Sequence, residues 1–163
     1  MEEVKTYKRH TALKIYDISR WFYLHNMNVL AKFFYRINNV MYQCSIAYES
    51  EIDKTVNLCH AHGLQINKGV YIGPNTVIFQ NVAIGAKYPE AKVDIKIGSN
   101  CILGANACVF GELTIGDNVH IGANTVVLKD IPSNSVVIGS KATIIKKKDT
   151  NKKETKKKTI KKK

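Results

Sequence analysis

The strongest constraint on this chain is a six-residue repeat between residues 46 and 132. Aliphatic residues recur in one phase through most of this segment, at Ile46, Ile52, Leu58, Ile66, Ile72, Ile78, Ile84, Ile97, Leu103, Val109, Ile115, Ile121 and Val127. A period of six matches neither the 3.6-residue period of an α-helix nor the two-residue alternation of a hairpin strand. It is typical of a coil in which each hexapeptide forms one flat side.

The other positions of the repeat support this interpretation. Glycine often follows the aliphatic residue, and asparagine precedes a small or β-branched residue four positions after it. We expect glycine and asparagine to adopt the corner backbone angles that β-branched residues resist. Three sides then make a coil of 18 residues, with parallel strands about 4.8 Å apart. The predicted fold is all-β: a left-handed parallel β-helix with a short N-terminal helical region and a disordered basic C-terminal tail.

Two breaks in the repeat predict departures from the regular wall. An eight-residue step from Leu58 to Ile66 contains two extra residues, which must bulge outward and carry His60 and His62. A 13-residue step from Ile84 to Ile97 contains 87–92, which we expect to leave the coil as a loop. Extra residues in a solenoid map to surface loops, which often bear function.

The pattern divides the chain into three parts. Residues 1–44 have helical spacing and no glycine or proline, and predict helices at 5–25 and 28–43 that cap the coil. Residues 45–145 form the predicted left-handed β-helix. Residues 146–163 contain 11 lysines and two acidic residues, so most of the net charge of +12 belongs to this predicted disordered tail. A basic groove on the fold is not implied.

Two features of the predicted coil offer chemistry. His60 or His62 on the bulge can act as a general base, because imidazole titrates near neutrality. Ala86, Ala105 and Ala123 each stand two residues after an aliphatic position, and would form a smooth ladder if the 13-residue step counts as two hexapeptides. No P-loop or GxGxxG motif is present, so a nucleotide-bearing ligand would lie along the ladder, with Lys129 and Lys141 near its phosphates.

A metal site has little support. No cysteine pair has zinc-ligand spacing, and His120 is the only other histidine in the repeat. Counting sides places His120 on a similar corner to His60 but about three coils away, or about 14 Å. Because a zinc–nitrogen bond is about 2 Å long, one chain cannot gather these ligands, and no metal is expected.

The segment from Ile52 to Ala142 resembles the serine acetyltransferase branch of the hexapeptide-repeat acyltransferases. The resemblance rests on IGANTVVLKDIPSNSVVIGSKA at 121–142 and on LCHAHG followed by Gln65 and Ile66. The short helical region is more similar to exopolysaccharide acetyltransferases. The resemblance implies that His60 is the catalytic base, that acetyl-CoA is the donor, and that Gly85, Ala105 and Ala123 line its groove.

Departures from that family matter for the acceptor. Ser45 stands where the family has the acidic residue that orients the histidine, and Glu49 and Glu51 are the candidates to substitute for it. The aspartate before the histidine is replaced by Cys59. The arginine–histidine pair of the serine-reading loop is replaced by about Val93 and Asp94. Because an unpaired buried charge costs several kcal/mol, zwitterionic serine is a poor acceptor here.

The sequence therefore predicts an acetyl-CoA-dependent O-acetyltransferase for a saccharide hydroxyl of a capsular polysaccharide, exopolysaccharide or lipopolysaccharide precursor. His62, Asp94 and Cys59 would contact the acceptor, and Gly85, Ala86, Ala105, Ala123, Lys129 and Lys141 the cofactor. The alternatives are a serine O-acetyltransferase and a non-catalytic trimeric scaffold. We expect a homotrimer without specific nucleic-acid binding. The N-terminus has no secretory signal, so a cytoplasmic location is expected, with peripheral contact to an anionic membrane.

Overall fold

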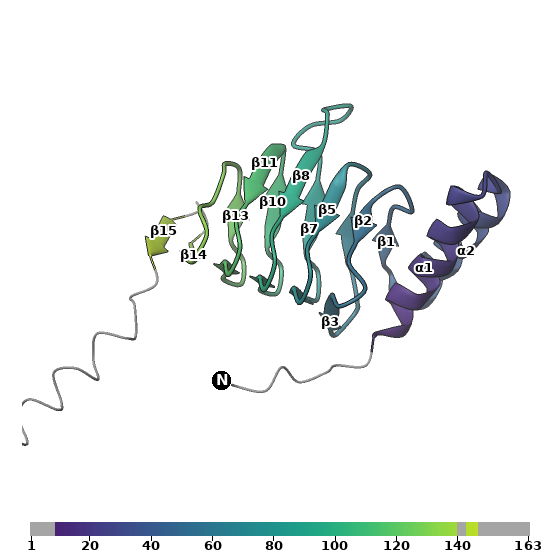
Figure 1. The fold of residues 1–163 in the computed structure, drawn as a ribbon, viewed down its shortest axis with the longest axis horizontal. Helices are drawn as coiled ribbons and strands as arrows, with labels where there is room; N and C mark the ends of the chain where they lie inside the picture. The colour runs from purple at the N-terminus through teal and green to yellow at the C-terminus, as the bar shows by residue number, and fades with distance from the viewer. Residues whose placement is uncertain (1–8, 140–142, 147–163) are drawn as a thin grey trace, which may run out of the picture.

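The computed structural model describes residues 9–139 and 143–146, which form a solenoid with two helices at one end (Figure 1). Helices α1 (Thr11–Leu24) and α2 (Asn28–Tyr42) precede the coils. Sheet A contains β1 (Ser45–Ile46), β4 (Gln65–Ile66), β7 (Ala83–Gly85), β10 (Cys108–Phe110) and β13 (Val126–Val127). Sheet B contains β2 (Glu51–Ile52), β5 (Val70–Ile72), β8 (Asp94–Ile97) and β11 (Glu112–Ile115). Sheet C contains β3 (Asn57–Cys59), β6 (Val77–Phe79), β9 (Ile102–Leu103), β12 (His120–Ile121), β14 (Ser135–Ile138) and β15 (Thr143–Lys146).

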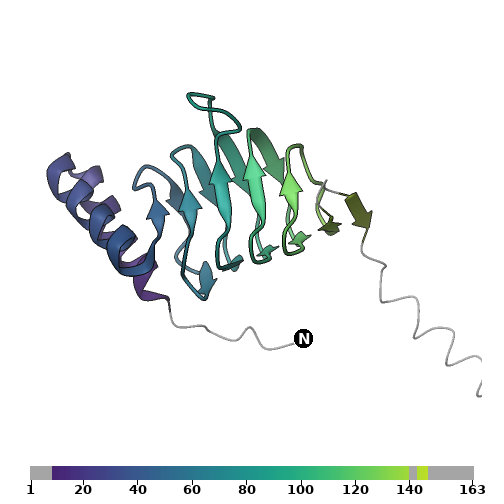
Figure 2. The same cartoon turned by 180° about the vertical axis from the view of Figure 1, so that it is seen from behind.

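These three sheets are the sides of the predicted left-handed β-helix, and the chain visits them in the order A, B, C. All strand pairs are parallel except that between β14 and β15. The regular coil has 18 residues, as in the pairing of Gln65 with Ala83. Ser45 pairs with Gln65 across the two-residue bulge, and Ala83 with Cys108 across the protruding loop (Figure 2). The last coil is two residues short, because His120 pairs with Val136.

The core is the aliphatic ladder that the repeat predicted. All thirteen aliphatic positions named from the sequence are buried, from Ile46 at the first coil to Val127 at the last. The small residues four positions later are buried as well, and include the polar Ser50, Thr76 and Thr125. Thr76 Oγ1 donates to the Gly98 carbonyl and accepts from the Cys101 amide, so its burial leaves no unsatisfied hydroxyl.

Asparagine and glycine serve different purposes at the corners. The six asparagines of the repeat have φ between 55° and 59°, the left-handed region that asparagine tolerates. The glycines after the aliphatic residues do not have positive φ, so our conformational explanation for them was wrong. A Cβ at Gly104 would lie 2.6 Å from the Ala123 amide nitrogen and 2.9 Å from the Gly122 carbonyl carbon. Close stacking of successive coils therefore requires glycine there.

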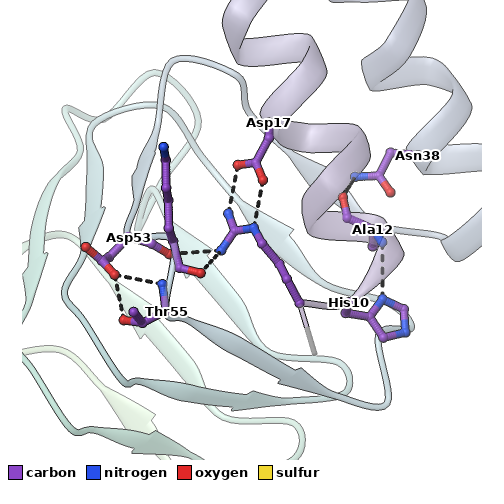
Figure 3. Close-up of polar contacts among 8 residues, drawn as sticks. His10, Ala12, Asp17, Asn38, Asp53 and Thr55 are labelled. Atoms are coloured by element: carbon purple, nitrogen blue, oxygen red, sulfur yellow. Dashed lines mark hydrogen bonds and ion pairs between the residues drawn. The ribbon is translucent and has the colours of Figure 1, made fainter. Parts of the chain in front are cut away.

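The helices cover the N-terminal end of the coil (Figures 1 and 2). Helix α1 begins at Thr11 and not at residue 5. His10 Nδ1 accepts a hydrogen bond from the Ala12 amide and so caps the helix at its first turn. Residues 5–8 of the predicted helix lie outside the described residues. Arg9 forms a two-point ion pair with Asp17, and its Nη1 donates to the carbonyls of Asp53 and Lys54 (Figure 3).

Further contacts fix the pair of helices in place. The Tyr16 hydroxyl donates to the Ser50 carbonyl at 2.6 Å, and Asn38 Nδ2 of α2 donates to the Ala12 carbonyl of α1 (Figure 3). The opposite end of the coil carries β15, which includes Lys146, so the strand extends one residue into the predicted tail. The rest of that tail lies outside the described residues.

The stacking of coils predicts a position-dependent cost for adding one methyl group. Gly104→Ala should reduce the free energy of unfolding by about 1–3 kcal/mol, because its Cβ meets backbone that cannot move without disturbing the next coil. Gly122→Ala is the matched control, since its Cβ would lie 3.2 Å from Ile138 Cγ2, a side-chain atom that can shift, and 3.3 Å from the Val137 carbonyl oxygen, so no backbone atom is as close as at Gly104. Urea unfolding of both variants tests this prediction, and equal destabilisation would contradict it.

Candidate functional site

His60 occupies a strained position at the start of the bulge. It follows β3 and has φ of 62°; outside the protruding loop it is the single coil residue with positive φ, among those described, that is neither asparagine nor glycine. Its carbonyl accepts from the His62 amide at 2.9 Å, and the His62 carbonyl accepts from the Asn81 amide at 2.8 Å. Ala61 and Leu64 are buried, and both histidine side chains are exposed. The bulge therefore exposes both imidazoles at the surface of the coil, where the break in the repeat predicted them.

His62 lies near the helical cap. Burial lowers the pKa of His10 below its ordinary value of 6.5, and the positive charge of His62 lowers it further. The His10 ring also packs edge-on against Tyr42, with 5.5 Å between ring centroids. The N-terminus of α1 and the histidine bulge are therefore electrostatically coupled.

The small-residue ladder has two members, and they lie at the same corner of the coil as His60, on later coils. Strand register places Ala105 and Ala123 one coil apart at the corner between sheets C and A. The same register places Gln80 and then His60 on the preceding coils at this corner. Neither the Ala105 nor the Ala123 amide donates a hydrogen bond within the described part of the chain. The ladder thus offers free backbone donors on the coils beyond the candidate base.

Ala86 does not belong to this ladder. It follows β7 at the corner between sheets A and B, because the protruding loop, and not two complete hexapeptides, fills the 13-residue step. Gly85 ends β7 and Lys129 follows β13, so both lie at or beside the same A–B corner. Lys129 is exposed, and Lys141 lies outside the described residues. The predicted cofactor residues therefore divide between two corners.

Asp94 is also remote from His60 within one chain. It begins β8 on sheet B, directly after the loop, where its exposed carboxylate lies 4.0 Å from Lys96 Nζ. One flat side of the coil separates the two corners, and six residues of strand extend about 20 Å. The structure does not bring the predicted base and the predicted acceptor residue together in one copy.

Ser45 and Glu51, two of the residues considered for orienting His60, are engaged elsewhere, whereas Glu49 forms no ion pair within the described residues. The Ser45 hydroxyl bonds to the Tyr35 hydroxyl at 2.5 Å, and Glu51 pairs with Arg20 at 3.7 Å. Sequence reasoning missed Gln80, whose Oε1 is buried without a hydrogen-bond partner on the coil next to His60. Cys59 is a half-buried free thiol in β3.

The described residues contain no cluster of three potential metal ligands. His120 lies in β12 on a flat side of sheet C, three coils from Asn57, so its predicted corner position was wrong. No described helix is long and apolar enough to cross a bilayer.

Three hollows lie beside the first coils in the described part of the chain, and none of them is lined by His60 or His62. A cleft of about 540 Å³ lies between α2 and the beginning of sheet A. A second hollow of about 700 Å³ lies beside the protruding loop and includes Ala86. A third, of about 220 Å³, is lined on sheet B by acidic residues that include Asp94.

Comparison with known proteins gives the fold and site a context. Residues 94–129 and 112–144 match the family model of the hexapeptide repeat of succinyl-transferase. The chain is 34% identical over 109 residues to a protein assigned as the colanic acid biosynthesis acetyltransferase WcaB of Escherichia coli K12, covering 64% of this chain and 67% of WcaB. It is 32% identical over 147 residues to the serine acetyltransferase of Staphylococcus xylosus, covering 90% of this chain and 68% of that enzyme.

Solved structures agree with this comparison. Serine acetyltransferase of Brucella abortus S19 in complex with coenzyme A is 25% identical, with a TM-score of 0.81 over 85% of this chain. The enzyme of Neisseria gonorrhoeae in complex with serine is 28% identical, with a TM-score of 0.78 over 82% of this chain. The chain spans 56% and 55% of the lengths of these two structures.

The lowered pKa of His10, caused first by burial and then by the charge of His62, predicts a pH effect. A histidine whose pKa is lower in the folded state takes up a proton more readily when unfolded, so stability falls as the pH drops below about 6.5. His10→Asn keeps a capping side chain and removes this titration, so its stability should fall less between pH 7.5 and 5.5. His62→Asn should raise the pKa of His10 towards 6.5 in an NMR titration; an unchanged pKa would refute the coupling.

Proposed function

The chain belongs to the hexapeptide-repeat acyltransferases, and we propose that it is an acetyl-CoA-dependent O-acetyltransferase for a saccharide hydroxyl, with His60 as general base. The observation that carries this proposal is the position of His60. It is held in left-handed backbone on the bulge, beside coils whose small corner residues leave backbone amides free. A strained residue at an exposed corner is a common sign of a functional group.

The reaction follows from this arrangement. The imidazole of His60 accepts the proton of the acceptor hydroxyl as the oxygen attacks the thioester carbonyl of acetyl-CoA. Negative charge develops on the carbonyl oxygen, where a free backbone amide can donate a hydrogen bond. The intermediate then expels the coenzyme A thiolate, which takes the proton from His60. No acyl-enzyme forms, so Cys59 is assigned to the acceptor side rather than to nucleophilic attack.

We assign acetyl-CoA to the ladder that contains Ala105 and Ala123, where the absence of large side chains lets the ligand approach backbone. Gly85, Ala86 and Lys129 would contribute from the A–B corner of a neighbouring copy, and Lys141 is retained as a phosphate contact. The coenzyme A complex of the Brucella enzyme supports this donor. Gln80 is our candidate for holding the His60 imidazole, since its buried Oε1 needs a donor.

The acceptor assignment rests on the loop. Asp94 and Val93 stand where we expect serine enzymes to hold a cationic pair, and an aspartate suits sugar hydroxyls better than a serine carboxylate. The similarity to WcaB, a protein assigned to colanic acid biosynthesis, supports a saccharide. The similarity to the Staphylococcus xylosus enzyme keeps serine as the second candidate.

We propose a homotrimer because the site is divided between two corners of one chain. Parallel packing of three coils would place the His60 corner of one copy against the Asp94 loop of the next, and closed threefold symmetry repeats this contact three times. His62 on the bulge would then contact the acceptor together with the partner's Asp94.

We also propose a cytoplasmic location with peripheral contact to an anionic membrane through the helical cap. Its outer surface exposes Val29 (82%), Val40 (83%), Phe33 and Trp21. Arg20 does not join this surface, because it donates to the Tyr48 and Ser50 carbonyls of the first coil.

His60→Asn tests the base. Asparagine accepts the left-handed backbone, so the variant should fold normally while its kcat falls at least about 100-fold. His62→Asn is the control from the same bulge and should change kcat less. Thiol release from acetyl-CoA is measured with saccharide and serine acceptors. Wild-type turnover in His60→Asn would refute the assignment, and a purely serine-dependent reaction would select the second candidate.

Mixed oligomers test the divided site. His60→Asn and Asp94→Ala should each be defective alone. Co-expressed in equal amounts, they should recover up to about a quarter of wild-type activity, because one neighbour pair in four then combines an intact His60 with an intact Asp94. Analytical ultracentrifugation should give a trimer. If the mixed trimer is no more active than the average of the two variants alone, the site is not divided between copies. Both residues then belong to one copy's site, or one of them lies outside the site.

A further inference from the structure

The cleft between α2 and sheet A has the construction of a ligand site. One wall consists of the α2 side chains Lys32, Tyr35 and Arg36. The other consists of the outer surface of β1 and β4 with the corner residues that follow them, including Tyr48 and Lys68. The bond between the Tyr35 and Ser45 hydroxyls fixes the walls relative to each other, and the Tyr35 and Tyr48 rings meet edge-on, with 6.1 Å between centroids.

The charge of this cleft is unbalanced. Lys32, Arg36 and Lys68 face a single carboxylate, Glu49, and none of the three cations forms an ion pair within the described residues. Lys32 and Arg36 stand four residues apart on one helix, where like charges repel. Helix α2 contains no acidic residue that could relieve this repulsion. An anion bound between the two walls would.

The cleft also continues towards the predicted acceptor loop. Glu49, Asn67 and Lys68 line both this cleft and the hollow of about 700 Å³ beside the loop, so the two form one trough. The loop residues 90–93 line the far end of the trough, directly before Asp94. A ligand longer than an amino acid could therefore span from the cations of α2 to the loop.

We propose that this cleft is an acceptor subsite that binds the carboxylate or phosphate of an acidic saccharide. The proposal rests on the acetyltransferase function proposed above and specifies its acceptor class. Arg36 offers the planar donor pair that matches carboxylate and phosphate, and the two lysines add charge. Tyr35 and Tyr48 present flat apolar surfaces for a sugar ring, and Asn67 and Ser45 present polar groups for its hydroxyls. The uncharged part of the saccharide, which carries the accepting hydroxyl, would extend along the trough.

Charge variants of the full chain test the subsite. Lys32→Gln, Arg36→Gln and Lys68→Gln are compared with Lys14→Gln, an exposed lysine on the other helix that lines none of these hollows. Calorimetry without acetyl-CoA measures binding of a glucuronic acid-containing disaccharide, glucose 1-phosphate and neutral maltose. Each cleft variant should bind the acidic probes about five- to tenfold more weakly, with unchanged maltose binding, whereas Lys14→Gln should match wild type. Tighter binding of one acidic probe identifies carboxylate or phosphate as the preferred group.

Turnover separates this proposal from the enzyme assignment. With an acidic acceptor, the cleft variants should raise KM for that acceptor without changing kcat or the KM for acetyl-CoA, and Arg36→Lys should restore part of the loss. Equal binding of acidic and neutral probes by wild type, or undiminished acidic binding by folded Gln variants, overturns the subsite. A charge effect seen only with anionic vesicles overturns it too. If binding of the acidic probes depends on the basic side chains of the cleft but no acceptor is acetylated, the enzyme function is refuted and the subsite proposal is not.

Discussion

Every feature of this molecule depends on the close stacking of one coil on the next. The aliphatic ladder is continuous only if each coil repeats the backbone path of its neighbour, and at Gly104 the next coil leaves no room for a Cβ. Extra residues cannot enter such a wall and must be expelled at a corner. The two expelled segments are the histidine bulge and the loop before Asp94, so the same constraint that makes the fold regular determines where it can bear function.

The periodic part of the structure was predictable because one short-range rule repeats in it. The phase of the aliphatic residues fixed which side chains are buried, and the asparagines fixed the left-handed corners. The glycines showed the limit of that rule, since contact with another coil, not local conformation, requires them. The prediction that Ala86 belongs to the small-residue ladder was wrong for a related reason. Counting hexapeptides assigns it to a corner only if all inserted residues stay in the wall, and those of the loop do not.

The helical cap was the part that sequence could locate but not orient. Its helical spacing was visible, yet its placement on the first coil depends on contacts between distant residues, such as Tyr16 with the Ser50 carbonyl and Arg9 with the Asp53 carbonyl. The cationic cleft arises only from that placement, because Lys68 comes from the second coil and Arg36 from α2. Arg20 illustrates the same limit: its position in the sequence does not show that its guanidinium donates to the Tyr48 and Ser50 carbonyls and so anchors α1 to the first coil.

The distribution of charge around the first coils gives the proposed acceptor a direction. Glu49 borders both the cationic cleft and the small hollow on sheet B, where Glu51 and Asp94 add two carboxylates and Lys96 a single cation, so this hollow carries a net negative charge. An acidic saccharide placed with its charge towards sheet B would meet these carboxylates, whereas the opposite orientation pairs it with Lys32 and Arg36. The loop end is then left for neutral hydroxyls, which an aspartate can accept from. Electrostatic repulsion on one side and attraction on the other thus select the end of the ligand that reaches the base.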